Sequence, residues 1–362
     1  MNRIEWSWYM PMSGDGEYVG MDFPERYPNI DYLVQVARTA EESGFDTILL
    51  PTQLFNNTYS EDAPYMDTWT VASAVGVLTE RIRLLIAVKT GETDPVRLAK
   101  MGATLDQMTN GRMVFNITTG GSTQTRFGVT LGHDERYERT EEVMEILKGL
   151  WTNDRFSYKG KYYFVENAVS SPKPVQKPYP PFYYAGVSEA AKKIAARLAD
   201  VQLIRGDIPE RVAHEIEDLE RRVQERGRRI RYGVRLNVIV RESEADAWAS
   251  AEKLLSKVNP EVLRQREALR QVSDSVQQGK IWSYLAKQDV IGPNLWTGLA
   301  KVRGGQGTVL VGTPDQIADR LMEYVELGVS LFILAGYPQV EECRRVGEWV
   351  LPLVNSRVKA TA

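Results

Sequence analysis

The chain has 362 residues, of which 43% are apolar and 26% are charged, a composition typical of a globular protein with a large core. Its 45 basic and 48 acidic residues give a net charge of −3, so we expect neither a nucleic-acid partner nor attachment to a membrane surface. The single cysteine, Cys343, excludes an internal disulfide framework, and the presence of only two histidines argues against a histidine-rich metal site. The start of the chain is unlike a signal peptide and no apolar run reaches about 18 residues, so we expect a cytoplasmic protein.

Short apolar runs alternate along the chain with segments whose apolar residues recur at helical spacing. The first run is followed by a turn and then by a segment in which Leu33, Val36, Ala37 and Ala40 lie on one helical face. Eight strands are expected, at 4–10, 47–50, 83–88, 113–117, 182–185, 201–204, 231–240 and 331–334. Helices are expected at 30–43, 69–78, 94–108 and 139–151, from residues 188 and 209 onward, and between the cap Thr313 and the stop Gly328.

Eight strand–helix units in a chain of this length predict an α/β fold of the closed (β/α)8 TIM-barrel type rather than an open doubly wound sheet. We expect one domain over residues 1–362. A hairpin is expected at 155–158 and 162–165, around Gly160. Residues 259–307 contain helical segments and glycine-rich loops but no clear strand, which predicts an insertion over the C-terminal face of the barrel, where active sites of this fold lie.

Two glycine-rich segments resemble nucleotide-binding motifs but lack their essential features. In GDGEYVG the third glycine, Gly20, comes one residue too late for a dinucleotide fingerprint, and the second strand ends without an acidic residue for a ribose. RGGQG, residues 303–307, lacks the Lys-Ser/Thr pair of a P-loop. We interpret RGGQG as a mobile lid, with an ordinary surface loop as the alternative.

Three polar motifs follow predicted strands, where a barrel places its active face. NITTGG begins at Asn116 and ends the fourth strand. YAGVS ends at Ser188, where a helix begins whose free amides can hold a phosphate, although a role as N-cap explains Ser188 equally well. HDERY, residues 133–137, either donates to a ligand or begins a solvated helix.

Alternation along RYGVRLNVIV places Arg235 and Asn237 on one face, opposite Val234 and Leu236. A charge in the barrel interior needs a partner, and a bound anion would provide one. We therefore expect Arg235 to contact an anionic ligand.

Seven segments spread along almost the whole chain share features with one family: GDGEYVG, ATLDQMTNGRMVFNITTGG, HDERY, YPPFYYAGVSEAA, RYGVRLNVIVRE, PNLWTGLAKVRGGQGTVLVG and LFILAGYP. Together they resemble the flavin-dependent alkanesulfonate monooxygenases of the bacterial luciferase-like family. The resemblance implies a TIM barrel and FMN, used as FMNH2 from a separate NAD(P)H-dependent FMN reductase. It also implies O2 as co-substrate and cleavage of an organosulfonate C–S bond to sulfite and an aldehyde. The resemblance further implies that the protein forms a homodimer or a homotetramer.

The resemblance also carries site residues over by motif position. Arg235 and Arg303 would bind the sulfonate and Tyr337 would line the same site; a guanidinium suits this task because its fixed fork of donors matches an oxyanion group. Seven residues would contact FMN, with the last at its phosphate: Asn116, Thr118, His133, Tyr137, Gly186, Val187 and Ser188.

The chain departs from the sulfonate branch at several positions of the expected site. Histidine is usual where this chain has Ser13, Asn237 and Gln339, and tryptophan is usual where it has Arg205. Cysteine is usual near Tyr65 and Met66, and the loop over residues 53–65 is longer here. We expect Ser13, Arg205, Asn237 and Gln339 to bind substrate, because these polar side chains suit a polar or hydroxylated sulfonate such as a sulfosugar.

Two alternatives stay open at this point. In the first, the chain is a related flavin monooxygenase that acts on a sulfone or another anion, using the same arginines. A flavin-binding protein without catalysis is the alternative from a different functional class.

Overall fold

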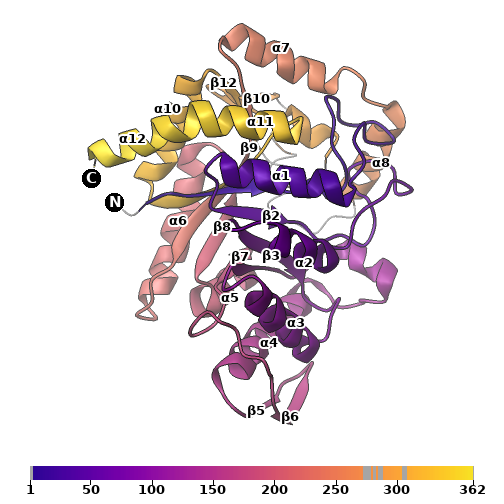
Figure 1. Cartoon of the computed structure of the whole chain (residues 1–362), viewed down its shortest axis with the longest axis vertical. Helices are drawn as coiled ribbons and strands as arrows, with labels where there is room; N and C mark the ends of the chain where they lie inside the picture. Colours follow the sequence, from indigo (N-terminus) through magenta and orange to yellow (C-terminus); the bar gives the residue numbers. More distant parts are fainter. Residues whose placement is uncertain (1–2, 272–278, 280–282, 284–287, 304–307, 362) are drawn as a thin grey trace.

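The computed structural model describes residues 3–271, 279, 283, 288–303 and 308–361, and its centre is a closed barrel of eight parallel strands (Figure 1). Each barrel strand pairs with the two barrel strands beside it, and the pairing of β8 with β9 and of β9 with β13 closes the ring. The predicted TIM barrel is therefore confirmed. In order around the barrel, the strands are β1 (Glu5–Tyr9), β2 (Thr47–Leu50), β3 (Arg83–Lys89), β4 (Met113–Thr118), β7 (Phe182–Ala185), β8 (Val201–Arg205), β9 (Arg231–Val240) and β13 (Val329–Ala335).

Helices follow the barrel strands and pack around them, as βα connections require. No helix in the described part of the chain is both long and apolar enough to cross a bilayer. The helices next to the barrel are α1 (Ile30–Glu42), α2 (Thr68–Leu78), α3 (Pro95–Met108), α4 (His133–Thr152), α5 (Glu189–Leu198), α6 (Pro209–Gln224), α10 (Pro314–Glu326), α11 (Gln339–Arg345) and α12 (Leu351–Thr361), while α7 (Glu244–Leu255) and α8 (Pro260–Gln271) precede the last units.

Local capping explains most of the helix starts. Thr313 accepts a hydrogen bond from the amide of Gln316 and caps α10, as the sequence predicts. The prediction that the fourth helix begins near residue 139 is wrong, because α4 already begins at His133. The Glu135 carboxylate accepts a hydrogen bond from the Gly132 amide at 3.0 Å and so stabilises the earlier first turn.

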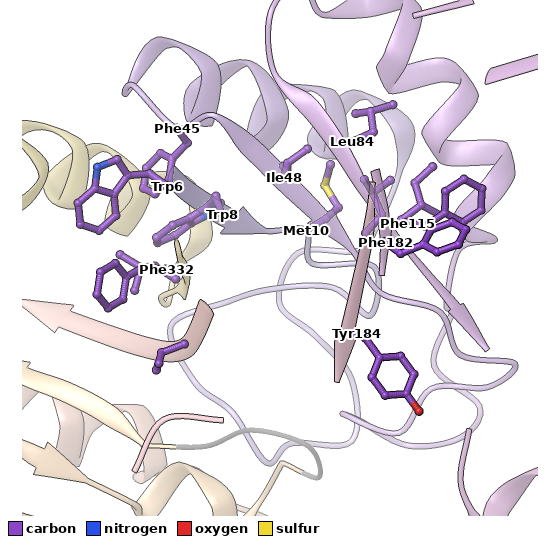
Figure 2. Packing of buried hydrophobic residues seen from close by; sticks show 14 of the residues in the cluster. Trp6, Trp8, Met10, Phe45, Ile48, Leu84, Phe115, Phe182, Tyr184 and Phe332 are labelled. Atoms are coloured by element: carbon purple, nitrogen blue, oxygen red, sulfur yellow. The ribbon is translucent and has the colours of Figure 1, made fainter. Parts of the chain in front are cut away.

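The side chains of the strands divide between two cores. In β1, Trp6 and Trp8 point outward toward the helices, and Trp6 stacks on Phe332 with ring centroids 5.4 Å apart (Figure 2). The intervening positions point into the barrel, where Tyr9 lies in a separate apolar cluster with Leu203 and other inward residues. This two-residue period fixes which face of each strand can reach a bound molecule.

Three short strands extend the barrel sheet beside β9, and two of them correct a prediction. The sequence predicts no clear strand in residues 259–307, but the structure has β10 (Val290–Gly292) and β11 (Leu295–Trp296) there. With β12 (Val309–Gly312) they extend the sheet beside β9. Strands of two or three residues are too short to show a periodic pattern, and they form because they pair with neighbouring strands.

The predicted hairpin is present, with strands displaced along the chain. It consists of β5 (Phe156–Lys159) and β6 (Phe164–Ala168), which pair antiparallel away from the barrel, beside the lower end of α4 in Figure 1. The second strand begins two residues later than expected because the turn is longer. Glu142 of α4 accepts hydrogen bonds from the amides of Lys161, Tyr162 and Tyr163 and holds that turn.

Candidate active site

A paired charge cluster closes the amino-terminal end of the barrel. Arg231, the first residue of β9, donates to the Glu5 carboxylate at 2.8 Å and to the Tyr183 hydroxyl at 3.0 Å. Tyr183 in turn donates to Glu5 at 2.7 Å. The arginine at this end of β9 therefore has a protein carboxylate as its partner.

The opposite, carboxyl-terminal end holds two arginines on neighbouring strands. Arg205 is the last residue of β8 and lies opposite Arg235 of β9 in the strand register. Arg205 follows the inward-facing Leu203 by two residues, so it shares that face. The guanidinium carbon of Arg235 lies 4.4 Å from the ring centroid of the inward-facing Tyr9. Both arginines thus point into the barrel, on the face that alternation predicts for Arg235.

A glycine brings the two strands close at this level. The amide of Gly206 donates to the carbonyl of Arg235 at 2.8 Å. A Cβ at position 206 would lie 2.2 Å from a methyl carbon of Leu236, so a larger residue would displace β8 from β9. Gly206 therefore helps hold Arg205 beside Arg235.

A third arginine reaches the same end of the barrel from the segment before β12. Arg303 is buried, donates to the Thr58 hydroxyl at 3.2 Å, and has its guanidinium carbon 5.2 Å from the ring centroid of Tyr337. The structure therefore brings together the three residues that the sequence places at the sulfonate. Residues 304–307, the rest of the segment for which we predict a lid, lie outside the described residues.

These arginines stand in strongly positive surroundings. Within the described ranges, no carboxylate forms an ion pair with Arg205, Arg235 or Arg303. Removal from water, and then the charge of Arg235, lower the pKa of Arg205 to about 10. The same two causes lower the pKa of Arg303, and burial and the Arg303 charge lower that of Arg266 to about 10. Such a cluster attracts an anion.

The loop after β2 covers this cluster and is tied to the loop after β1. The side-chain nitrogen of Asn56 donates to the carbonyls of Ser13 and Pro64, both at 3.1 Å. The Asn56 side-chain oxygen accepts from the amides of Thr58 and Tyr59 at 2.9 and 3.0 Å. Asn56 thus connects the predicted substrate residue Ser13 with Thr58, the hydrogen-bond partner of Arg303.

A buried acid lies beside the cluster. Asp15 accepts hydrogen bonds from the Tyr32 hydroxyl and from the backbone N–H of Gln339, the latter at 2.7 Å. Burial outweighs these hydrogen bonds and raises the pKa of Asp15 to about 6. Across the residues with described positions, no group of three or more His, Cys, Asp or Glu side chains is arranged to hold a metal ion.

Other predicted substrate residues place polar atoms in the same region. Asn237 follows Arg235 by two residues, lies opposite Ala335 of β13 and is buried. Tyr337 and Gln339 follow β13 and are buried as well. In the described structure, the Tyr337 hydroxyl and the side-chain oxygen and nitrogen of Gln339 have no hydrogen-bond partner. A bound molecule with polar groups would satisfy them.

The strand β4 contributes the first two predicted cofactor residues. Asn116 and Thr118 alternate with the outward-facing Phe115 and Ile117, so both point into the barrel. The Thr118 hydroxyl donates to the Val88 carbonyl at 3.3 Å. The side-chain oxygen of Asn116 is buried without a hydrogen-bond partner in the described residues, which leaves an acceptor for a ligand.

The other predicted cofactor residues lie where α4 and α5 begin. The His133 ring lies 4.8 Å from the Tyr137 ring, and a Cβ at Gly186 would lie 3.4 Å from the Tyr137 hydroxyl and 2.8 Å from Cβ of Ala191. Gly186 has φ of +140°, which favours glycine. The buried Val187 follows, and Ser188 accepts from the Ala191 amide at 3.2 Å as the N-cap of α5.

Sequence reasoning missed several residues around the arginines. Tyr9, Asp15, Thr58, Tyr59 and Arg266 received no role, although Asp15 lies in the GDG motif. Their signals are weak, since each is a single polar or aromatic residue in a loop, at a strand end or, for Arg266, within α8. Their place beside Arg235 or Arg303 arises from contacts between distant segments.

Comparison with known proteins agrees with this architecture. The sequence model of the family described as luciferase-like monooxygenase matches residues 6–331. A structure of long-chain alkane monooxygenase (LadA) is similar with a TM-score of 0.79 and 22% identity, covering 99% of this chain and 92% of that chain. DmoA from Hyphomicrobium sulfonivorans has a TM-score of 0.78 and 23% identity, covering 99% and 89%. An F420-dependent secondary alcohol dehydrogenase in complex with an F420-acetone adduct has a TM-score of 0.70 and 16% identity, covering 98% and 99%.

Proposed function

This chain belongs to the luciferase-like monooxygenase family, and from that membership we propose that it is an FMNH2- and O2-dependent monooxygenase that cleaves the C–S bond of an organosulfonate. The family uses reduced flavin or F420. The single observation that carries the proposal is the group formed by Arg205, Arg235 and Arg303, which face the barrel end without a carboxylate ion pair in the described structure. A sulfonate would supply the missing negative charge.

The reaction balances with one molecule of each reactant. RCH2SO3⁻, O2 and FMNH2 give RCHO, HSO3⁻, FMN and H2O, so that one oxygen atom enters the aldehyde and the other leaves as water. The oxidised carbon loses its bond to sulfur, and sulfur leaves as sulfite. The reduced flavin supplies the electrons that activate O2 when it is bound.

The residues of β4, of the segment after β7 and of the start of α4 fit a flavin. Asn116 offers a buried acceptor, Gly186 leaves room beside the Tyr137 hydroxyl, and the start of α5 at Ser188 favours a phosphate through its dipole. His133, Thr118 and Val187 would complete this surface. We further propose that a separate NAD(P)H-dependent reductase delivers the FMNH2.

The chain's own residues have separable tasks in this reaction. Arg235, supported by Tyr9, and Arg303, supported by Thr58, hold the sulfonate and orient the carbon that carries it. Both supports come from the protein before any ligand arrives, so little side-chain entropy is lost on binding. Tyr337, Asn237, Gln339 and Ser13 would contact the rest of a polar substrate.

The direct test is sulfite release from a panel of sulfonates in the presence of FMNH2 and O2. We expect Arg235→Lys, which keeps the charge but loses the donor fork, to lower kcat/KM by about 10- to 100-fold. The matched control is Arg231→Lys on the same strand, whose partner Glu5 lies at the other end of the barrel; we expect a change of at most about twofold. The absence of sulfite with every sulfonate would refute the proposal, and tight FMN binding without turnover would favour a non-catalytic flavin protein.

A further inference from the structure

We propose, on the basis of the function proposed above, that the natural substrate carries a second anionic group, and that Arg205 binds this group beside the sulfonate held by Arg235 and Arg303. The chemical class is a short sulfonate that also bears a carboxylate. The second group takes no part in the reaction and remains on the aldehyde product.

The position of Arg205 places it within reach of the same molecule as Arg235. The two residues are register partners in adjacent parallel strands, and such strands lie about 4.8 Å apart. Both side chains point into the barrel, yet both keep partial access to water. A small molecule at this end of the barrel can therefore contact both guanidinium groups.

Arg205 differs from the other two arginines because the protein does not support it. Arg235 lies on the ring of Tyr9, and Arg303 donates to Thr58 and lies near the ring of Tyr337. In the part of the chain that is described, the Arg205 side chain has no hydrogen bond, ion pair or ring contact. It faces the positive charge of Arg235. No contact among the described residues shows that Arg205 stabilises the fold from this position.

The balance of charge favours a dianion over a single sulfonate. Arg205, Arg235 and Arg303 carry three positive charges, whereas the nearby Arg266 is partly compensated by the charge of Glu61. The acid whose charge acts on Arg303 is Asp15, which hydrogen bonds to Tyr32 rather than to an arginine. One sulfonate would leave most of this positive charge without compensation. A sulfonate with a carboxylate would pair Arg205 as well.

A carboxylate matches the remaining guanidinium in shape. Its two oxygens accept two parallel hydrogen bonds from one arginine, whereas a hydroxyl accepts from only one donor at a time and carries no charge. Arg205 therefore discriminates between a carboxylated and a merely hydroxylated substrate. This distinction can be measured.

The test uses three sulfonates of equal length: 3-sulfopropanoate, 3-hydroxypropane-1-sulfonate and propane-1-sulfonate. Dissociation constants from isothermal titration of the whole protein are compared with sulfite release in the presence of FMNH2 and O2. We expect 3-sulfopropanoate to bind about 10- to 100-fold more tightly than the other two, the scale of a hydrogen bond to a charged group. Arg205→Met should abolish this preference by weakening the binding of 3-sulfopropanoate far more than that of propane-1-sulfonate.

Two further variants keep the result interpretable. Arg205→Lys restores the charge without the fork and should recover part of the preference. Arg231→Lys, at the closed end of the barrel, should keep all of it. If the hydroxylated compound binds as tightly as 3-sulfopropanoate, or if Arg205→Met weakens all three equally, the inference is wrong although the proposed function stands. If no sulfonate binds or yields sulfite, the proposed function fails and takes the inference with it.

Discussion

Replacing Arg205 with methionine is expected to stabilise the fold while it impairs the site. Removal from water and the nearby charge of Arg235 lower the pKa of Arg205 to about 10, roughly two and a half pH units below the ordinary value of a guanidinium. One pH unit corresponds to about 1.4 kcal/mol, so the charged form is disfavoured in the folded protein by up to about 3.5 kcal/mol. Because Arg205 keeps partial access to water, we expect Arg205→Met to gain about 1–2 kcal/mol.

The sign of this effect is fixed over the ordinary pH range. A base whose pKa falls on folding destabilises the protein at every pH below the folded value, and the penalty begins to decrease only as the pH rises above about 10. At neutral pH the penalty is therefore fully present. With an unfolding entropy of about 2 cal/mol/K per residue, a gain of this size in a 362-residue chain raises Tm by about 1–3 °C.

The matched comparison is Arg231→Met, which removes an arginine from the same barrel at its closed end. This change removes the guanidinium that donates to the Glu5 carboxylate at 2.8 Å, and it should lower the free energy of unfolding by about 1–3 kcal/mol. Differential scanning calorimetry and urea unfolding of both variants at pH 7 measure the two effects. If Arg205→Met destabilises the protein as Arg231→Met does, Arg205 has a structural partner and our reasoning about the cluster is refuted.

Three other changes test separate parts of the site. Ser188→Ala should weaken FMN binding by about 1 kcal/mol, or about fivefold in Kd by fluorescence titration; an unchanged Kd would leave Ser188 with its N-cap role alone. Arg303→Ala should oxidise more FMNH2 per sulfite released, whereas Arg235→Ala should mainly lower kcat/KM; fully coupled turnover in both would contradict their role at the substrate. Burial raises the pKa of Asp15 to about 6, so the free energy of unfolding falls as the pH rises from about 4 to about 6 and the buried carboxyl ionises. Asp15→Asn should flatten the profile of Tm against pH in this range, and an unaltered profile would contradict the raised pKa of Asp15.

Much of the fold follows from the amino-acid pattern alone. The apolar runs that predict eight strands correspond to the eight strands of the barrel, because a strand buried on both faces needs a continuous apolar segment. The start of α10 follows from the local capping of Thr313. The two-residue period of β9 places Arg235 and Asn237 on the inner face without any knowledge of the neighbouring strands. These features depend on residues close together in the sequence.

The grouping of the site depends on tertiary structure. Arg205 and Arg235 become neighbours only through the register of β8 and β9, and Arg303 meets Thr58 across 245 positions of the sequence. The short strands β10 and β11 likewise form only through their pairing. Local sequence determines which face a side chain occupies, but the charge around it depends on which distant segments pack there. For that reason the sequence identifies Arg205 as a departure from its relatives, and the fold shows that it has no carboxylate partner in the described structure.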